Sequence, residues 1–394
     1  GPNVPQMKTS PLLHCAATAM CALIMTTMPS CNKSHTPEEN VTEKFAAAMD
    51  SLMRERYGAD SAAAPGGSVL IAKGDSVLYE AYFGTADLAT GEPIDSATLF
   101  CIASVSKQFT VAAVLKQMEA GTVDIDSAAA RYLPYKHPLW QRVTLADLAG
   151  HTSGIPDDRD RSSREACVFA TDETSVEYFP GVTATKFEPG TAYDYLNPSF
   201  ILLANVVADK TGMTFTDYAA QALFRPAGMK STVYFSPEGM PVHTSHAYEP
   251  DSAGRWHEYD YGEETFFATR PDGGIYSTVR DMTAWNRALM GGRMLSDSLR
   301  RKAWAPRVSV SDSPWCDYQR RPNTWYGLGW FIERVEGCPD VVYHTGDNGG
   351  YQAYSAMIPD EDISIVVLEN RHDQPRRAMT QAIMELLRQC GFMK

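Results

Sequence analysis

Ile102–Thr110 reads IASVSKQFT and joins an apolar run ending at Cys101 to an apolar helix predicted for residues 111–120. Ser104 therefore lies at or near a helix start, with Lys107 about one turn further along the same face. A serine hydroxyl becomes a useful nucleophile when a nearby base takes its proton. Lysine can be that base where burial and the helix dipole lower its pKa, and the unpaired amides at a helix start can stabilise an oxyanion.

This S-x-x-K pattern has little specificity by itself, since Ser30–Lys33 matches it as well. The alternative for any single match is a surface serine followed by a helical lysine. Two motifs further along the chain distinguish Ser104 from this alternative.

The composition is typical of a globular protein. The 394 residues carry a formal net charge of −13, with 44% hydrophobic and 21% charged residues. Such a length allows a large core, and the acidic balance argues against nucleic acid as a partner.

The N-terminus differs from the rest of the chain. Residues 1–6 resemble a tag remnant, and a basic start with an apolar run over residues 12–28 leads to Cys31. Residues 1–30 therefore resemble a tag remnant plus the signal peptide of a bacterial lipoprotein, with Cys31 lipidated and residues 31–40 as a tether. A plain secretory signal or an uncleaved membrane anchor is the alternative. In each case we expect an exported protein, periplasmic or on the outer surface of a bacterium.

Five of the eight cysteines lie beyond this leader, without C-x-x-C pairs or the spacing of a zinc site. The sequence accordingly implies no metal and no cofactor. Cys316 and Cys338 are either a disulfide, in an oxidising compartment, or separate buried thiols. Cys101 is expected to be a packed core residue.

Hydrophobic patterns predict an antiparallel sheet with a helix at each end of the chain. The expected elements are a helix at 41–57, a hairpin at 68–72 and 77–83, strands at 326–335, 341–344, 351–358 and 363–368, and a helix at 375–389. Residues 132–270 alternate loops with helical segments. These patterns predict an α+β fold, in which residues 41–131 and 271–394 form a sheet domain and 132–270 a mostly helical inserted subdomain.

A second motif is Tyr195-Leu196-Asn197, the single Y-x-N of the sequence. A phenol beside a lysine ammonium can pass a proton between a serine hydroxyl and a leaving group. An asparagine two residues later can bind a substrate carbonyl and the lysine together. The alternative is a packed aromatic residue and an asparagine that caps a helix beginning at Pro198.

The third motif is His344-Thr345-Gly346, followed by Asp347 and preceded by a strand-like run. A strand edge with histidine, threonine and flexible glycines can lie along an extended acyl group and donate hydrogen bonds to it. Taken alone, the motif also fits a hairpin turn with an incidental histidine. The literal K-T-G at Lys210–Gly212 is interpreted instead as a helix C-terminus.

In the order S-x-x-K, Y-x-N and H-T-G, the three motifs resemble those of the serine β-lactamase and penicillin-binding-protein superfamily. The tyrosine motif is similar to the branch of class C β-lactamases, DD-carboxypeptidases, D-aminopeptidases and β-lactamase-fold esterases, from about Gly66 to the C-terminus. The resemblance implies a β-lactamase/transpeptidase-like fold and an acyl-enzyme mechanism.

By position, the resemblance implies that Ser104 is the acylated nucleophile and Lys107 its proton acceptor or electrostatic activator. Tyr195 would be the general base or acid, and Asn197 would orient the substrate. Residues 344–347 would bind the carboxyl side of the substrate, and the amides of Ser104 and residue 347 would form the oxyanion hole.

Two residues depart from class C β-lactamases. His344 replaces a lysine, and as a largely neutral side chain near pH 7 it attracts a β-lactam carboxylate more weakly. Asp347 puts an acid beside the oxyanion position, where it would repel a carboxylate, attract an amino group or face solvent. We therefore expect a hydrolase of amides or esters, with D-amino-acid-containing peptides as first candidates. The alternatives are a class C-like β-lactamase, a short-chain esterase, or a catalytically silent penicillin-binding or partner-binding module.

Overall fold

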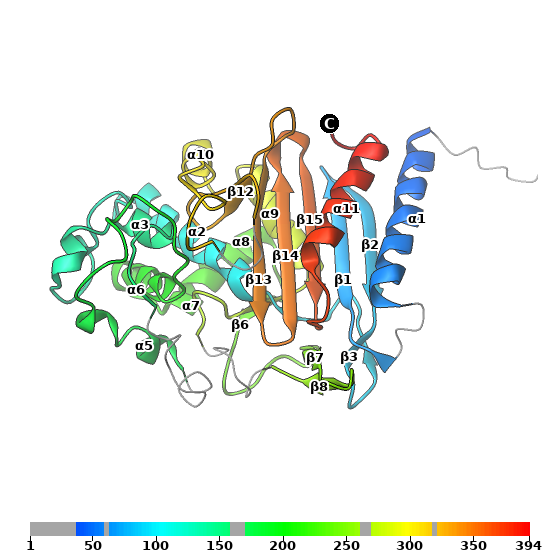
Figure 1. The fold of residues 1–394 in the computed structure, drawn as a ribbon, viewed down its shortest axis with the longest axis horizontal. Helices are drawn as coiled ribbons and strands as arrows, with labels where there is room; N and C mark the ends of the chain where they lie inside the picture. The colour runs from blue at the N-terminus through cyan, green and yellow to red at the C-terminus, as the bar shows by residue number, and fades with distance from the viewer. Residues whose placement is uncertain (1–36, 59–62, 158–169, 261–268, 317–320) are drawn as a thin grey trace, which may run out of the picture.

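The computed structural model describes residues 37–58, 63–157, 170–260, 269–316 and 321–394. The predicted signal peptide, Cys31 and most of the predicted tether lie outside the described residues. Figure 1 shows a large sheet in one part of the molecule and a group of short helices in the other.

The main sheet is antiparallel and has eight strands in the order β10-β11-β12-β13-β14-β15-β1-β2. In this order they are Val308–Ser309, Thr324–Tyr326, Phe331–Glu333, Val341–Asn348, Tyr351–Ile358, Ile363–Glu369, Gly67–Lys73 and Ser76–Phe83. The β1–β2 hairpin and the run from β13 to β15 confirm the strands predicted there. Because β1 pairs with β15, the first hairpin of the chain completes the sheet begun by its last strands.

Helices cover both faces of the sheet (Figure 1). α1 (Pro37–Tyr57) and α11 (Arg376–Gln389) contact each other on one face, and α9 (Val279–Met290) packs on the other, against β15 and β1. Phe45 and Met49 of α1 are fully buried, as their helical spacing predicts. Both predicted terminal helices are confirmed.

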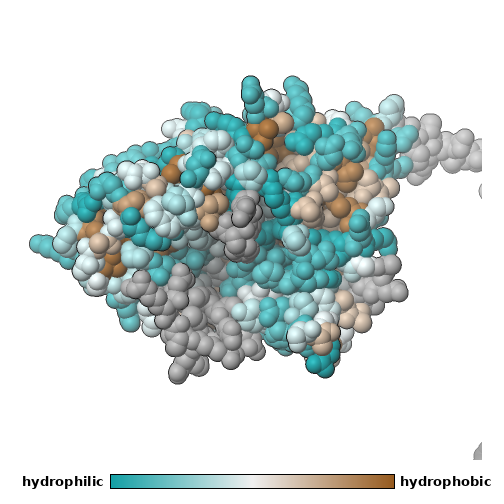
Figure 2. Space-filling view, in the orientation of Figure 1, coloured by the Kyte–Doolittle hydropathy of each residue, from teal (hydrophilic) through white to brown (hydrophobic). Residues whose placement is uncertain are grey.

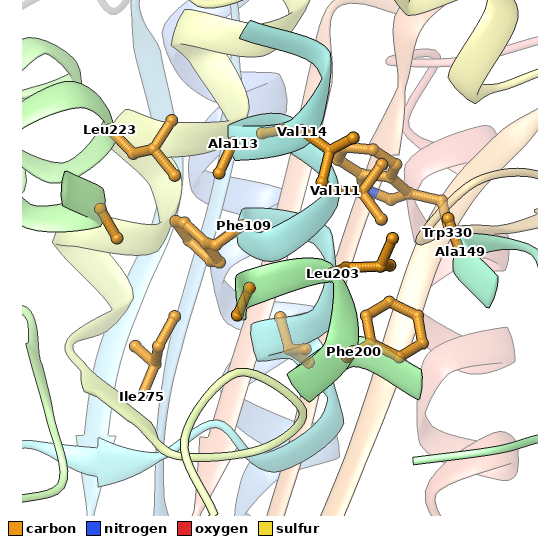
Figure 3. Close-up of a cluster of buried hydrophobic side chains, with 14 of the residues drawn as sticks. Phe109, Val111, Ala113, Val114, Ala149, Phe200, Leu203, Leu223, Ile275 and Trp330 are labelled. Carbon is orange, nitrogen blue, oxygen red and sulfur yellow. The ribbon is translucent and has the colours of Figure 1, made fainter. Parts of the chain in front are cut away.

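The helix that follows Ser104 lies in the middle of the core. α2 (Lys107–Glu119) buries ten of its thirteen residues, so burial extends around the helix rather than along one stripe and takes in the polar side chains of Lys107, Gln108, Thr110 and Gln117. Figure 3 shows Phe109 on one side of this helix and Val111 and Val114 on the other, toward Trp330. The nucleophile candidate is thus attached to a long helix that is almost entirely enclosed by the core.

The structure corrects one predicted strand. Tyr326 is the last residue of β11 and Phe331–Glu333 form β12, with a turn at 327–330 between the two strands. Gly329 has a φ of 83°, which suits glycine, and a Cβ there would lie 2.7 Å from Val111 Cγ2. The turn buries Trp330, whose indole N–H donates to Gln108 Oε1 at 3.1 Å. Packing against α2 therefore interrupts the strand.

The remaining helices are short, apart from α6. They are η2 (Ala103–Ser106), η3 (Ala129–Arg131), η4 (Pro138–Gln141), α3 (Leu145–Ala149), α5 (Asp172–Ser175), η6 (Phe179–Gly181), α6 (Ser199–Thr211), α7 (Phe215–Ala219), η7 (Ala220–Phe224), α8 (Arg225–Ala227), α10 (Asp297–Ala303) and η8 (Pro359–Glu361). Lys210–Gly212 ends α6, with Gly212 at a φ of 68°, so the interpretation of this K-T-G as a helix C-terminus is confirmed. The assignment of residues 132–270 to a separate subdomain stays a prediction.

Several short strands were not predicted from the sequence patterns. They are β3 (Thr85–Asp87), β4 (Glu92–Pro93), β5 (Phe100–Cys101), β6 (Val233–Tyr234), β7 (Tyr248–Pro250), β8 (Trp256–Glu258) and β9 (Ile275–Ser277). β5, β9 and β6 form a small sheet that leads into the Ser104 turn. Segments of two or three residues have no periodicity to detect.

Hydrophilic side chains dominate the face drawn in Figure 2, where apolar residues form separate small patches. Among the described helices, none is long and apolar enough to cross a membrane. Cys316 and Cys338 are free thiols, so of the two predicted alternatives the structure has the unbridged one, with both residues half-buried. Cys101 is buried, as predicted.

Candidate active site

Ser104 lies in the 3-10 turn η2, which leads directly into α2. Ala103 has a φ of 46°, in the left-handed region that non-glycine residues rarely occupy unless packing holds them there. The Ile102 N–H donates to the Ile275 carbonyl oxygen at 2.9 Å. Ser104 is half-buried, whereas the residues on either side of it are buried. The core therefore presents this one hydroxyl from a rigid turn.

Lys107 is the first residue of α2 and is fully buried. Its Nζ donates to Ser104 Oγ at 2.9 Å and to the Asp272 carbonyl oxygen at 2.7 Å. The S-x-x-K spacing thus brings the amine to the hydroxyl across one turn, and a backbone carbonyl from a distant segment fixes it there.

The ring of Tyr195 lies against the same amine. Lys107 Nζ is 4.8 Å from the centroid of this ring, and the imidazole of His151 stacks on it with centroids 4.1 Å apart. His151 Nδ1 also accepts the Leu196 N–H at 2.9 Å, so one imidazole holds both the ring and the backbone of the Y-x-N segment. Burial and the Lys107 charge hold the pKa of His151 well below its usual range, and this imidazole is therefore neutral.

Asn197 lines the same pocket as Ser104. The helix after it begins at Ser199 and has Pro198 as its N-cap. The alternative interpretation of Asn197 as a helix cap is therefore wrong. The cap falls one residue later, on a proline whose fixed φ suits a helix start.

His344 is buried in β13 with both ring nitrogens bonded. Nδ1 lies 2.7 Å from the Thr345 carbonyl oxygen and Nε2 lies 2.9 Å from the Tyr326 hydroxyl. Because a carbonyl only accepts, Nδ1 carries the proton and the Tyr326 hydroxyl donates to Nε2. Burial, then the Lys107 charge, hold the pKa of His344 well below its usual range. The imidazole is neutral and fixed within the strand.

β13 passes directly over the nucleophile turn at Gly346. A Cβ at this position would lie 2.2 Å from the Ile102 carbonyl oxygen and 3.0 Å from the Ser104 amide nitrogen. The sequence pattern suggests that this glycine supplies flexibility, but the structure requires it because the two backbones touch. Pairing of β12 with β13 ends at Tyr343, so residues beyond it form an edge of the sheet.

Thr345 and Asp347 point to the opposite face of β13, toward α11, as strand alternation dictates. Thr345 Oγ1 accepts a hydrogen bond from Arg321 at 2.8 Å. Asp347 accepts two from Arg376, at 3.1 Å and 2.9 Å, and its side chain is 22% exposed. Burial alone would raise the pKa of Asp347, but the Arg376 guanidinium outweighs burial and lowers this pKa. The carboxylate is thus ionised and paired with Arg376. Its charge is therefore compensated, whereas the sequence suggested an acid that acts on the substrate or faces solvent.

A pocket of about 100 Å³ opens at Ser104. Its walls are formed by Ala103, Ser104, Asn197, Thr269, Asp272, Gly273, Asp347 and Asn348. Three predicted site residues, Ser104, Asn197 and Asp347, therefore lie at this pocket. The side chains of His344 and Thr345 are engaged elsewhere, by Tyr326 and Arg321.

Sequence reasoning missed two residues that fix this site. They are Asp272, which binds Lys107 through its carbonyl, and Arg376, which binds Asp347. His151, which the sequence interpretation treats as structural, stacks on Tyr195. A backbone carbonyl has no side-chain signature, and the Arg376–Asp347 pair joins a helix to a strand with no fixed spacing. The glycines at 273–274, which predict a tight turn, were the only indication near Asp272.

One group of described residues outside the pocket could hold a cation. The ligand atoms of His246, Glu258 and Asp260 lie within 4.8 Å of one another. In the structure His246 Nδ1 pairs with both carboxylates, at 2.5 Å from Glu258 and 2.7 Å from Asp260. The three side chains thus form an ion-pair cluster beside the β7–β8 hairpin.

Comparison with known proteins agrees with this geometry. The Beta-lactamase family model matches residues 42–388. The chain is 27% identical to the D-alanyl-D-alanine-carboxypeptidase/endopeptidase AmpH of Escherichia coli K12, over 93% of this chain and 94% of that protein. It is 29% identical to a D-aminopeptidase of Cereibacter sphaeroides over 81% of its length, and it spans 59% of that enzyme.

Among solved structures, the penicillin binding protein from Bacillus halodurans has a TM-score of 0.73 and 27% identity, covering 87% of this chain and 98% of that chain. These matches confirm the predicted superfamily and the predicted α+β, β-lactamase/transpeptidase-like fold. The chain belongs to the beta-lactamase family and is a serine hydrolase.

Proposed function

We propose that the protein cleaves amide or ester bonds through an acyl-enzyme on Ser104, and that its substrates are peptides containing D-amino acids. The observation that carries this proposal is the 2.9 Å contact between Lys107 Nζ and Ser104 Oγ, beside the Tyr195 ring. Relatives named D-alanyl-D-alanine-carboxypeptidase/endopeptidase and D-aminopeptidase support the substrate class.

In acylation, Ser104 Oγ attacks the substrate carbonyl carbon while its proton passes to the Lys107–Tyr195 pair. The carbonyl oxygen becomes an oxyanion, which the N–H groups of Ser104 and Asp347 stabilise. The carbon–nitrogen or carbon–oxygen bond then breaks, and Tyr195 gives the proton to the leaving amine or alcohol. In deacylation, water attacks the ester, Tyr195 takes its proton, and Ser104 Oγ recovers a proton as the acid leaves.

The neutral state of His344 favours substrates without a carboxylate beside this residue, such as D-amino acid amides and esters, over β-lactams. A cationic side chain at this position would attract the carboxylate of a β-lactam, and a buried imidazole with a lowered pKa does not. A class C-like β-lactamase is therefore the weaker candidate, and a short-chain esterase remains the competing activity.

Four substrates measured side by side test the proposal: a peptide ending in D-Ala-D-Ala, a D-amino acid p-nitroanilide, nitrocefin and a short-chain p-nitrophenyl ester. We expect the highest kcat/KM for a D-amino-acid substrate and none for its L counterpart. A preference for the L form or for nitrocefin would contradict the substrate class.

A fluorophosphonate probe tests the nucleophile separately. In the unprocessed full chain, we expect the wild type and Ser30→Ala, which alters the other S-x-x-K match, to be labelled equally, and Ser104→Ala to remain unlabelled. Labelling of Ser104→Ala at the wild-type level, or no labelling of the wild type, would leave the catalytically silent binding module as the better interpretation.

We also propose export as a lipoprotein, on the pattern of residues 1–31. Mass spectrometry of the N-terminus, after expression of the full chain in bacteria, separates the alternatives. A lipid on Cys31, lost in Cys31→Ser, supports the proposal. A cleaved chain without lipid indicates a plain secretory signal, and an intact leader indicates a membrane anchor.

A further inference from the structure

Arg376, the first residue of α11, places a buried guanidinium against β13. It donates to the carbonyl oxygens of Gly346 and Ala353 at 3.2 Å and 3.3 Å, and to both carboxylate oxygens of Asp347. The residue is 7% exposed. A charged side chain that is held this closely fixes the backbone to which it is bonded.

The carbonyl that Arg376 binds belongs to the peptide unit between Gly346 and Asp347. This unit is planar and trans, so its C=O and N–H point in opposite directions. Arg376 also binds the carbonyl oxygen of Ala353, the β14 partner of Gly346, so the Gly346 carbonyl lies on the β14 side of the strand. The Asp347 N–H therefore points to the opposite edge of β13, beyond its pairing with β12. Asp347 and Ser104 line the same pocket, so this N–H is the second donor that the acyl-enzyme proposal requires.

Two electrostatic effects of Arg376 act in the same direction. A cation bonded to a peptide carbonyl polarises the amide and strengthens its N–H as a donor. The same guanidinium also neutralises the Asp347 carboxylate, whose negative charge would otherwise oppose an oxyanion forming nearby in a poorly solvated site. An unpaired carboxylate at this position would therefore destabilise the oxyanion, and pairing with Arg376 removes that effect.

We propose that Arg376 is a positioning residue for the oxyanion site, which it serves by orienting and polarising the Gly346–Asp347 peptide and by cancelling the charge of Asp347. This inference rests on the proposed acyl-enzyme function. It assigns a role in catalysis to α11, the helix that carries Arg376. Arg376 itself does not line the pocket at Ser104.

The test compares Arg376→Met, Asp347→Asn, the double variant and Arg377→Met. The adjacent Arg377 is the matched control, because it lies in the same helix, its side chain is 40% exposed, and within the described part of the chain its ion-pair partner is Glu333, at 3.8 Å. We expect Arg376→Met to lower kcat and the rate of fluorophosphonate labelling by about 10- to 100-fold, less than the effect of deleting an oxyanion donor outright, with KM little changed. The double variant should recover part of this loss, because it removes the unpaired carboxylate.

Recovery in the double variant separates an electrostatic role from a merely structural one, since a second substitution in a damaged fold would lower the rate further. The inference is overturned if Arg376→Met is labelled at the rate of Arg377→Met, or if the double variant is no faster than Arg376→Met. These outcomes presuppose a wild type that is labelled at Ser104. Failure of that labelling would instead contradict the proposed function.

Discussion

His151 and Tyr195 stack with their ring centroids 4.1 Å apart and an angle of 29° between the rings. His151 adopts a φ of 59°, a conformation that asparagine tolerates better than most residues do. The stack and the bond from Leu196 N–H together fix the phenol beside Lys107.

His151→Asn should therefore keep the backbone of this turn and lose the stack. We expect kcat/KM to fall by about 100-fold, because a misplacement of about 1 Å in a reacting group has an effect of this size. The melting temperature should fall less than in His151→Ala, which strains the positive φ as well. An unchanged kcat/KM in His151→Asn would show that the stack does not position Tyr195.

Lys107→Met should remove the amine and keep the shape of the core. We expect acylation of Ser104 to slow by about 10²- to 10⁴-fold, the usual effect of general acid–base catalysis. The flexible methionine side chain fills the same space, so the melting temperature should not fall. The measurement is the rate of fluorophosphonate labelling, with Lys116→Met in the same helix as the control. Wild-type rates in Lys107→Met would contradict the role of this amine.

Gly346→Ala should disrupt the site through packing alone. The added Cβ would lie 2.2 Å from the Ile102 carbonyl oxygen, so β13 and the nucleophile turn must separate. We expect loss of activity and a lower free energy of unfolding, both measured on purified protein. Gly181→Ala is the control, because a Cβ there has no neighbour within 4 Å. Equal behaviour of the two variants would contradict this interpretation.

The ion-pair cluster at His246 predicts a pH-dependent stability. A hydrogen bond to Asp260 raises the pKa of His246 to about 9, above its value in an unfolded chain. Its stabilisation is therefore complete below about pH 6.5 and is lost as the pH rises through 9. Since the side chain is partly exposed, we expect on the order of 1 kcal/mol.

Unfolding of His246→Gln and of the wild type in urea, at pH 6 and at pH 10, measures this effect. The difference in free energy of unfolding should be present at pH 6 and small at pH 10. His243→Gln, at a more exposed histidine, should show little difference at either pH. A difference for His246→Gln that grows with pH would contradict the assigned ion pair.

The sequence predicts those parts of the fold that local patterns determine. The hairpin at 68–83, the strands after 341 and the helix after Ser104 follow from periodicity and turn residues. The order of the three motifs identifies the family, since each motif alone is ambiguous. The break at 327–330 could not be predicted, because it depends on how Trp330 packs against a helix more than 200 residues earlier.

In the candidate site, too, local sequence spacing predicts some features, whereas others depend on packing between distant segments. Ser104 and Lys107 are one turn apart in a helix, and local spacing is enough to bring them together. Gly346 and Asp347 take their meaning from backbone contact with Ile102 and from pairing with Arg376. Such contacts arise only when distant elements pack. The sequence motif therefore predicts that these residues belong to the site, but not which contacts require them.

The enclosure of α2 has a consequence for how the enzyme is inactivated by heat. Amide protons in a helix that is buried on every side exchange with solvent only when the whole domain opens. The nucleophile and its amine are attached to this helix, so no smaller opening should disable them. Loss of probe labelling on heating should thus coincide with cooperative unfolding, and the reactive serine would report the population of intact molecules.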